Sequence, residues 1–192
     1  MPAPAADNFV HSLDARSLGH VLRATVRTLL ATTPPNTAAA FTRAARTRLV
    51  NTNAKTLPRS LVLFTTRPED GEAIATESLH DALAHARSLY GAGMGFTSLG
   101  VYASIVRLTL GLRWTNDGET ADSLALIDGD ICQAIQSSKE EVEGGRAGDM
   151  TGAQEKVSEL RTMLQESMND VVRWGGEFPF ERAAASLDCW KI

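Results

Sequence analysis

The chain has 192 residues, 43% of them hydrophobic and 22% charged, with two cysteines and a formal net charge of −4. This length suffices to bury about 70% of the surface that the unfolded chain exposes. The hydrophobic and charged fractions and the two cysteines exclude a disordered, collagen-like or disulfide-stapled protein. We expect a single helical domain over residues 14–192, preceded by a loose N-terminal arm of residues 1–13.

Two amphipathic helices are expected first, over residues 14–32 and 37–51. In the first, Leu18, Leu22 and Leu29 share an apolar face, and the two prolines Pro34 and Pro35 end the helix. Basic residues occupy the opposite face of the first helix and the outward side of the second. This basic face, a candidate binding surface, comprises Arg16, His20, Arg23, Arg27, Arg43 and Arg46.

Residues 57–76 carry the weakest helical signal. A short apolar run over residues 61–64 has the length of a strand, and a turn signal follows at residues 68–71. We expect a short β-hairpin near residues 60–76.

Four further helices are expected over residues 78–90, 97–113, 119–143 and 151–174. The helix over residues 97–113 is apolar nearly all round, which is typical of a helix buried at the centre of a bundle. The tail from residue 174 onward is rich in aromatic residues, so we expect an ordered strap over the core. The predicted fold is an all-α bundle of six to seven helices.

The glycine-rich turn between the third and fourth helices has two interpretations. Backbone N–H groups in front of a helix can bind phosphate, which makes Gly91, Gly93 and Gly95 a candidate anion-binding turn. However, the turn follows a helix rather than a strand and lacks the lysine of a P-loop. We therefore favour a structural role, in which the glycines end one helix and let the next approach its neighbour closely.

Motifs for catalysis or metal binding are weak. Glu77 and His80 have the spacing of one half of a di-iron site, but the four histidines supply no second half. Asp128 and Asp130 point to different faces of a helix, which spoils an acid/base pair, and we expect both to be solvated. Asp128 lies near the apolar side of that helix, and if it is buried it needs a partner such as an N-terminal arginine. We therefore assign no catalytic residue, metal ligand or cofactor.

Two further classes are disfavoured. Residues 88–106 are uncharged, but only 11 of these 19 residues are apolar, which favours a buried helix over a membrane span. Charged residues interrupt the first 30 positions, so a secretory signal is not expected. We expect an intracellular, cytoplasmic location. Mitochondrial import is the alternative, because the N-terminal part is rich in arginine and poor in acids.

The charges are segregated along the chain. Residues 1–68 hold nine basic and two acidic residues, a net charge of +7, whereas residues 69–192 hold 10 basic and 21 acidic residues, a net charge of −11. No carboxylate occurs between Asp14 and Glu69. The basic part either packs on the acidic part, within one chain or across a dimer, or binds another anionic partner. The pI near 5.6 disfavours nucleic acid.

Two functions are consistent with these patterns. The first is a non-enzymatic protein-interaction or scaffold module whose basic face docks on an acidic protein surface, including that of a second copy in a homo-oligomer. The alternative is a helical enzyme or carrier that encloses an apolar small molecule beside the helix over residues 97–113.

Overall fold

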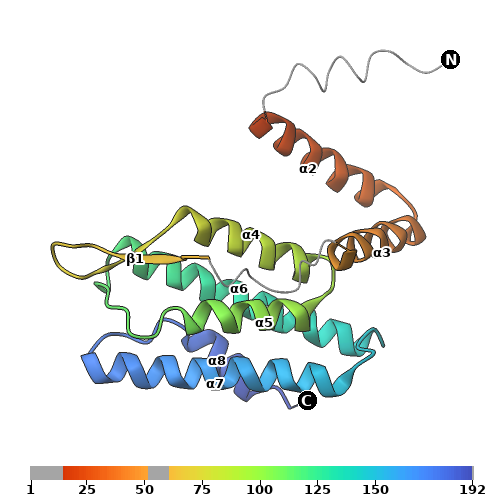
Figure 1. Ribbon diagram of the computed structural model, residues 1–192. Coiled ribbons are helices and arrows are strands. Elements are labelled where there is room, and N and C mark those ends of the chain that lie inside the picture. Colours follow the sequence, from red (N-terminus) through yellow and green to blue (C-terminus); the bar gives the residue numbers. More distant parts are fainter. Residues whose placement is uncertain (1–14, 52–60, 192) are drawn as a thin grey trace. The chain divides into compact units, whose positions relative to one another are not determined.

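The computed structural model of the protein describes residues 15–51 and 61–191. Within these ranges the chain forms seven helices and one two-stranded hairpin (Figure 1), which confirms the predicted all-α bundle with a short hairpin. The chain divides into two compact units, Met1–Ala44 and Ala45–Ile192. The loose arm expected over residues 1–13 lies outside the described residues, and the single domain expected from residue 14 stays a prediction.

The first unit contains α2 (Ala15–Thr32) and the beginning of α3 (Pro35–Asn51). Proline has no N–H group to donate, so Pro35 fits the first turn of α3, where N–H groups lack helical partners. Where burial is described, both helices include exposed apolar residues. Leu22 and Leu29 of α2 are 59% and 51% exposed, and α3 has no buried residue in its length.

The hairpin pairs β1 (Phe64–Thr66) with β2 (Ala73–Ala75) in antiparallel register, as expected near residues 60–76. Gly71 supplies the left-handed conformation that the connection needs, with φ of +74°. The Oγ1 of Thr120 donates to the carbonyl of Ala73 at 2.6 Å, in a buried hydrogen bond that joins the hairpin to α6 (Glu119–Glu143).

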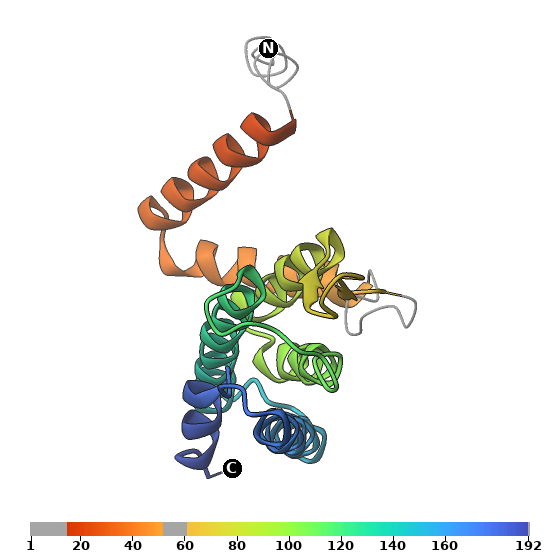
Figure 2. The same cartoon turned by 90° about the vertical axis from the view of Figure 1, so that its left-hand side faces the viewer.

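Five helices make up the rest of the second unit: α4 (Glu77–Gly91), α5 (Gly95–Arg107), α6 (Glu119–Glu143), α7 (Met150–Trp174) and α8 (Glu181–Asp188). Helix α5 lies between α4 and α7 (Figure 1), while α6 and α8 form a second layer (Figure 2). Nine of the 13 residues of α5 are buried, among them Leu99, Tyr102 and Ile105. This confirms the central position predicted from the absence of a polar face.

One helix boundary was predicted wrongly. Helix α5 ends at Arg107 rather than at residue 113, because the chain turns over residues 108–111. The Oγ1 of Thr109 donates to the carbonyl of Val106 at 2.7 Å, and Gly111 takes the left-handed conformation with φ of +81°. The Gly111 amide then donates to Asp170 of α7 at 2.9 Å. A distant carboxylate therefore helps to hold the chain in its turn.

The aromatic tail packs on the core, as expected. Phe180 is fully buried and lies 5.9 Å from Phe178 in an edge-to-face pair, measured between ring centroids. Trp190 stacks on Phe96 at 5.9 Å between centroids. Between these aromatic residues, α8 buries Ala183 and Leu187. The strap thus includes a short helix that the sequence analysis did not identify.

Candidate functional site

Only two members of the predicted basic face have described side chains. The side chains of Arg16, His20, Arg23 and Arg27 lie outside the described part of the structure. Arg43 belongs to the first unit and is exposed. Arg46 belongs to the second unit and differs from the expected outward position, because its guanidinium pairs with Glu141 of α6 at 3.2 Å. The docking role of the face stays a prediction.

Glu141 is a buried acid that the sequence analysis missed. The residue is only 8% exposed, and its Oε1 accepts the hydrogen bond from Nη2 of Arg46. Its Oε2 is buried and has no hydrogen-bond partner among the described residues. Burial raises the pKa of the Glu141 carboxyl. The charge of Arg46 and the backbone amides of Phe96 and Gly95 oppose this rise, although neither amide bonds to Oε2.

A signal for Glu141 is present in the sequence. It lies three residues after Ser138 and seven after Ala134, both of which are buried, so it continues the buried face of α6. Its neighbours Glu140 and Glu143 give this stretch the composition of a solvated helix end. Composition therefore hid a position that helical spacing would have identified.

Glu141 lines a cleft beside α5 with a volume of about 560 Å³, which we call the α5–α7 cleft. Helix α5 contributes Thr97, Gly100 and Ser104, which lie on the least buried side of this helix. The opposite wall comes from α7 and the loop before it, and includes Asp149. The cleft has the size of a small-molecule site. Its charged lining differs from the apolar enclosure expected for a carrier, and that alternative function stays a prediction.

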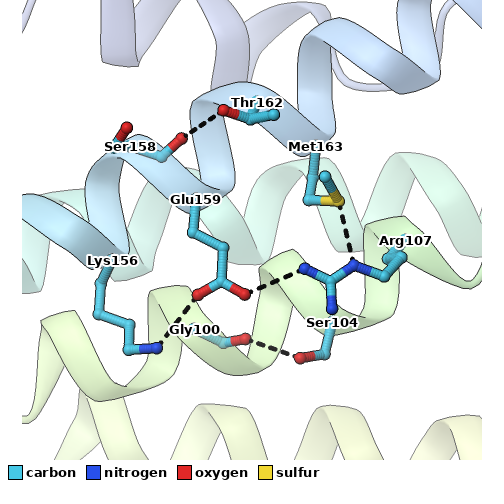
Figure 3. Close-up of polar contacts among 8 residues, drawn as sticks. All are labelled: Gly100, Ser104, Arg107, Lys156, Ser158, Glu159, Thr162 and Met163. Carbon is cyan, nitrogen blue, oxygen red and sulfur yellow. Dashed lines mark hydrogen bonds and ion pairs between the residues drawn. The ribbon is translucent and has the colours of Figure 1, made fainter.

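A chain of polar contacts lies at the α7 side of the cleft (Figure 3). The Glu159 carboxylate forms two ion pairs, one from Oε2 to the Lys156 ammonium and one from Oε1 to the Arg107 guanidinium. The N···O distance is 3.1 Å in both. The Nε of Arg107 also donates to the sulfur of Met163 at 3.3 Å. Lys156 reaches back over Gly100, where a Cβ atom would lie 2.9 Å from the Lys156 Cδ. The absence of a side chain at Gly100 thus makes room for Lys156.

The N-terminus of α7 closes another side of the cleft. Asp149 is the N-cap residue, and its Oδ1 accepts the hydrogen bond from the Gly152 amide at 2.9 Å. This arrangement is favourable because a carboxylate satisfies an amide that has no helical partner and interacts well with the helix dipole. The cap places a second carboxylate in the same cleft as Glu141.

The glycine turn has the structural role that we favoured. Gly93 has a φ of +73°, and a Cβ added to Gly95 would lie 2.6 Å from the Cα of Ser138 on α6. The turn therefore ends α4 and lets α5 approach α6 closely. The anion-binding role of Gly91, Gly93 and Gly95 stays a prediction, and the carboxyl of Glu141 lies near enough to the Gly95 amide for that amide to lower its pKa.

The expectation that Asp128 and Asp130 are solvated is wrong. Asp128 is 3% exposed and accepts hydrogen bonds from Arg182 Nε at 2.7 Å and from the Ala183 amide at 2.8 Å. Helix α8 has no side-chain cap of its own, so Asp128 provides the hydrogen-bond acceptor for its N-terminal turn. Asp130 pairs with Arg87 of α4 at 2.7 Å. Both acids join helices rather than forming an acid/base pair.

A second cleft of about 540 Å³ lies where β2 meets the start of α6. His80, Glu119 and Ser123 are among its lining residues, which are types that nucleophilic catalysis uses. The Ser123 hydroxyl, however, donates to the backbone carbonyl of Glu119 at 2.9 Å. This geometry does not activate a serine, since the hydroxyl proton is held by a carbonyl oxygen rather than by a base.

Within residues 15–51 and 61–191, no group of three or more His, Cys, Asp or Glu side chains has the geometry of a metal site. The helices in the same ranges also include none with the length and apolar character needed to cross a membrane.

Comparison with known proteins gives no match for this chain, whether with protein-family models, curated proteins or solved structures. The functional argument therefore depends on the residues and geometry above.

Proposed function

We propose that the protein is a non-enzymatic interaction module whose first two helices dock on an acidic protein surface, and that a second copy of the chain provides this surface. The docking element is residues 15–44, which we call the helical arm. It comprises α2 and the part of α3 that belongs to the first unit.

The observation that carries the proposal is the exposed apolar side of α2. Leu22 and Leu29 lie seven residues apart, which places them on one side of the helix, and each is more than half exposed. Most helical stability in proteins comes from packing of an apolar face rather than from helix propensity, and α2 leaves two leucines of such a face in water. A partner that covers this side would both stabilise α2 and remove its leucines from water.

By helical spacing the basic residues of α2 lie on the face opposite Leu22 and Leu29, so their charge acts from outside the apolar contact, steering the arm toward an acidic partner. Residues 15–68 contain no carboxylate, so the helical arm has no acidic group to repel an acidic surface. Residues 69–192 carry a net charge of −11, and a second copy brings the same charge. Opposite potentials steer two surfaces together and disfavour wrong partners. A pairing in which each copy offers its arm to the other also has the two-fold symmetry that most homo-oligomers adopt.

Size-exclusion chromatography with light scattering tests this proposal on the full chain at low and high salt. We expect a dimer at low salt and weaker association at high salt, because salt screens charges at an exposed interface. The variant Leu22→Ser/Leu29→Ser removes apolar groups from the arm, and Arg23→Glu/Arg27→Glu reverses its charge. Each should weaken the dimer by at least about tenfold, which corresponds to about 1.4 kcal/mol.

The chain offers a matched control. Leu126 and Val172 belong to the second unit and are 62% and 71% exposed, so Leu126→Ser/Val172→Ser removes a similar amount of exposed apolar surface from outside the arm sequence. This control should dimerise like the wild type. A monomer at every salt concentration, or equal weakening in the control, would contradict the proposal. Binding of a monomeric chain to anionic lipid vesicles through the same arm would assign the arm to a membrane surface instead.

A further inference from the structure

The two cysteines of the chain are free thiols on neighbouring helices, Cys132 on α6 and Cys189 at the C-cap of α8. Cys189 is exposed, whereas Cys132 is half-buried. The Sγ of Cys132 lies 3.8 Å from the Oγ of Ser186, so this thiol faces α8. Ser186 precedes Cys189 by three residues, and residues with this spacing are neighbours on a helix surface. Both thiols therefore belong to the contact between α6 and α8.

Helices α6 and α8 run in the same direction along this contact. Asp128 of α6 accepts hydrogen bonds from the first turn of α8, and Cys132 contacts α8 one turn further along both helices. Beyond that point, the ammonium of Lys139 lies 5.8 Å from the centre of the Trp190 ring. Cys189 thus lies between two positions of the strap that contact α6. This placement keeps its backbone beside the stretch of α6 that begins at Cys132.

The two thiols are about one helical turn out of register. Neighbours three residues apart on a helix have Cβ atoms about 5–6 Å apart, whereas a disulfide needs Cβ atoms about 3.8 Å apart. Cys189 therefore has to move toward Cys132 before the two can bond. The Cys189 amide donates to the carbonyl of Ala185 at 3.1 Å, and the chain beyond this residue is not helical. Because helix ends fray, this last turn opens at low cost.

We propose that Cys132 and Cys189 form a redox-sensitive pair, which a low-molecular-weight disulfide oxidises to a bond that ties the strap to α6. The thiolate of the exposed Cys189 attacks one sulfur of the small disulfide and expels the other half as a thiolate. The Cys132 thiolate then attacks the Cys189 sulfur of this mixed disulfide and expels the second half. Two cysteine thiols are thereby oxidised, and one small disulfide is reduced to two thiols, which take up the two protons. This inference does not depend on the proposed docking of the helical arm.

Incubation of the full chain with oxidised glutathione, followed by alkylation of the remaining thiols and mass spectrometry, tests the proposal. We expect the wild type to lose both free thiols and to yield a peptide that links Cys132 to Cys189. Cys132→Ser should instead retain glutathione on Cys189, at least about tenfold more than the wild type, because no second thiol resolves the mixed disulfide. Cys189→Ser should react at least about tenfold more slowly, because its remaining thiol is half-buried.

Urea unfolding gives a second readout. The oxidised wild type should unfold at a higher urea concentration than the reduced wild type, because a disulfide restricts the unfolded chain, and a reductant should reverse the difference. Cys189→Ser treated in the same way should show no difference. If Cys132→Ser fails to fold, Cys132→Ala replaces it, with circular dichroism to verify the fold. Equal glutathione adducts in the wild type and the Cys132 variant, thiols that stay free, or a disulfide between two chains would overturn the assignment.

Discussion

Replacing Gly95 with alanine should separate two central helices. A Cβ atom at residue 95 would lie 2.6 Å from the Cα of Ser138, whereas ordinary contacts begin near 3.4 Å, so α5 has to move by at least about 0.8 Å. Ser138 meets this atom with its backbone, which cannot rotate away as a side chain can. Overpacking in a well-packed core costs typically 1–3 kcal/mol, and a backbone clash belongs at the upper end of that range, near about 3 kcal/mol.

The two other glycines of the turn supply graded controls. Gly93→Ala should cost about 1 kcal/mol, because the φ of +73° is unfavourable for a residue with a side chain. Gly91 has an ordinary backbone and nothing within 4 Å of an added Cβ. Since alanine favours helix over glycine by about 0.5–1 kcal/mol, Gly91→Ala should leave stability unchanged or slightly raised.

Urea unfolding followed by circular dichroism measures the three variants under one set of conditions. We expect the free energy of unfolding to be highest for Gly91→Ala, intermediate for Gly93→Ala and lowest for Gly95→Ala. A loss of about 3 kcal/mol in Gly95→Ala corresponds to a melting temperature lower by about 10 °C in a chain of this size. Equal stability of Gly95→Ala and Gly91→Ala would refute the close approach of α5 and α6.

Three further outcomes are expected. Asp128→Ala should lower the free energy of unfolding by about 2 kcal/mol, because the Ala183 amide at the start of α8 loses its acceptor, whereas the exposed Glu140→Ala should stay within about 0.5 kcal/mol of the wild type. Phe180→Ala should cost about 3–5 kcal/mol by leaving a cavity under the strap, and a smaller loss in urea unfolding would show that the strap contributes little. The wild type should gain stability relative to Glu141→Gln as the pH falls from about 7 to about 4, and a constant difference between the two would contradict the account of Glu141.

The sign of this pH effect follows from the burial of Glu141. Burial raises the pKa of its carboxyl, so the folded protein binds this proton more tightly than the unfolded chain does. The contribution of Glu141 to stability is therefore fully present below its ordinary pKa and is lost as the pH rises through the raised value. Glutamine does not titrate, so the difference between the two proteins isolates this residue.

Helical spacing predicted most of the fold because burial follows periodicity. Helix α5 is apolar nearly all round and is buried on most of its surface. In α7, Val157, Leu160 and Leu164 lie at intervals of three and four, and all three are buried. The close helix approach that we favoured for the glycine turn is seen at Gly95, whereas the anion-binding alternative stays a prediction. Both features depend on residues that lie close together in the sequence, so one sequence is enough to predict them.

Helical spacing can indicate that Glu141 is buried, but it does not identify the residue that pairs with it. Glu141 is buried with Arg46, which lies 95 residues away, and Asp128 is buried with Arg182, 54 residues away. A carboxylate is buried only when a partner stabilises it, and the identity of a distant partner is not encoded in local spacing. The end of α5 was missed for the same reason: the Gly111 amide donates its hydrogen bond to Asp170 of α7, which is distant in the sequence.

Sedimentation equilibrium of the full chain at low salt tests the central claim most directly. The account predicts a mass of twice 20.6 kDa that declines toward 20.6 kDa as salt is added, with the Leu22→Ser/Leu29→Ser variant monomeric under conditions where the wild type is dimeric. A mass of 20.6 kDa for the wild type at every salt and protein concentration would contradict docking of the helical arm on a second copy.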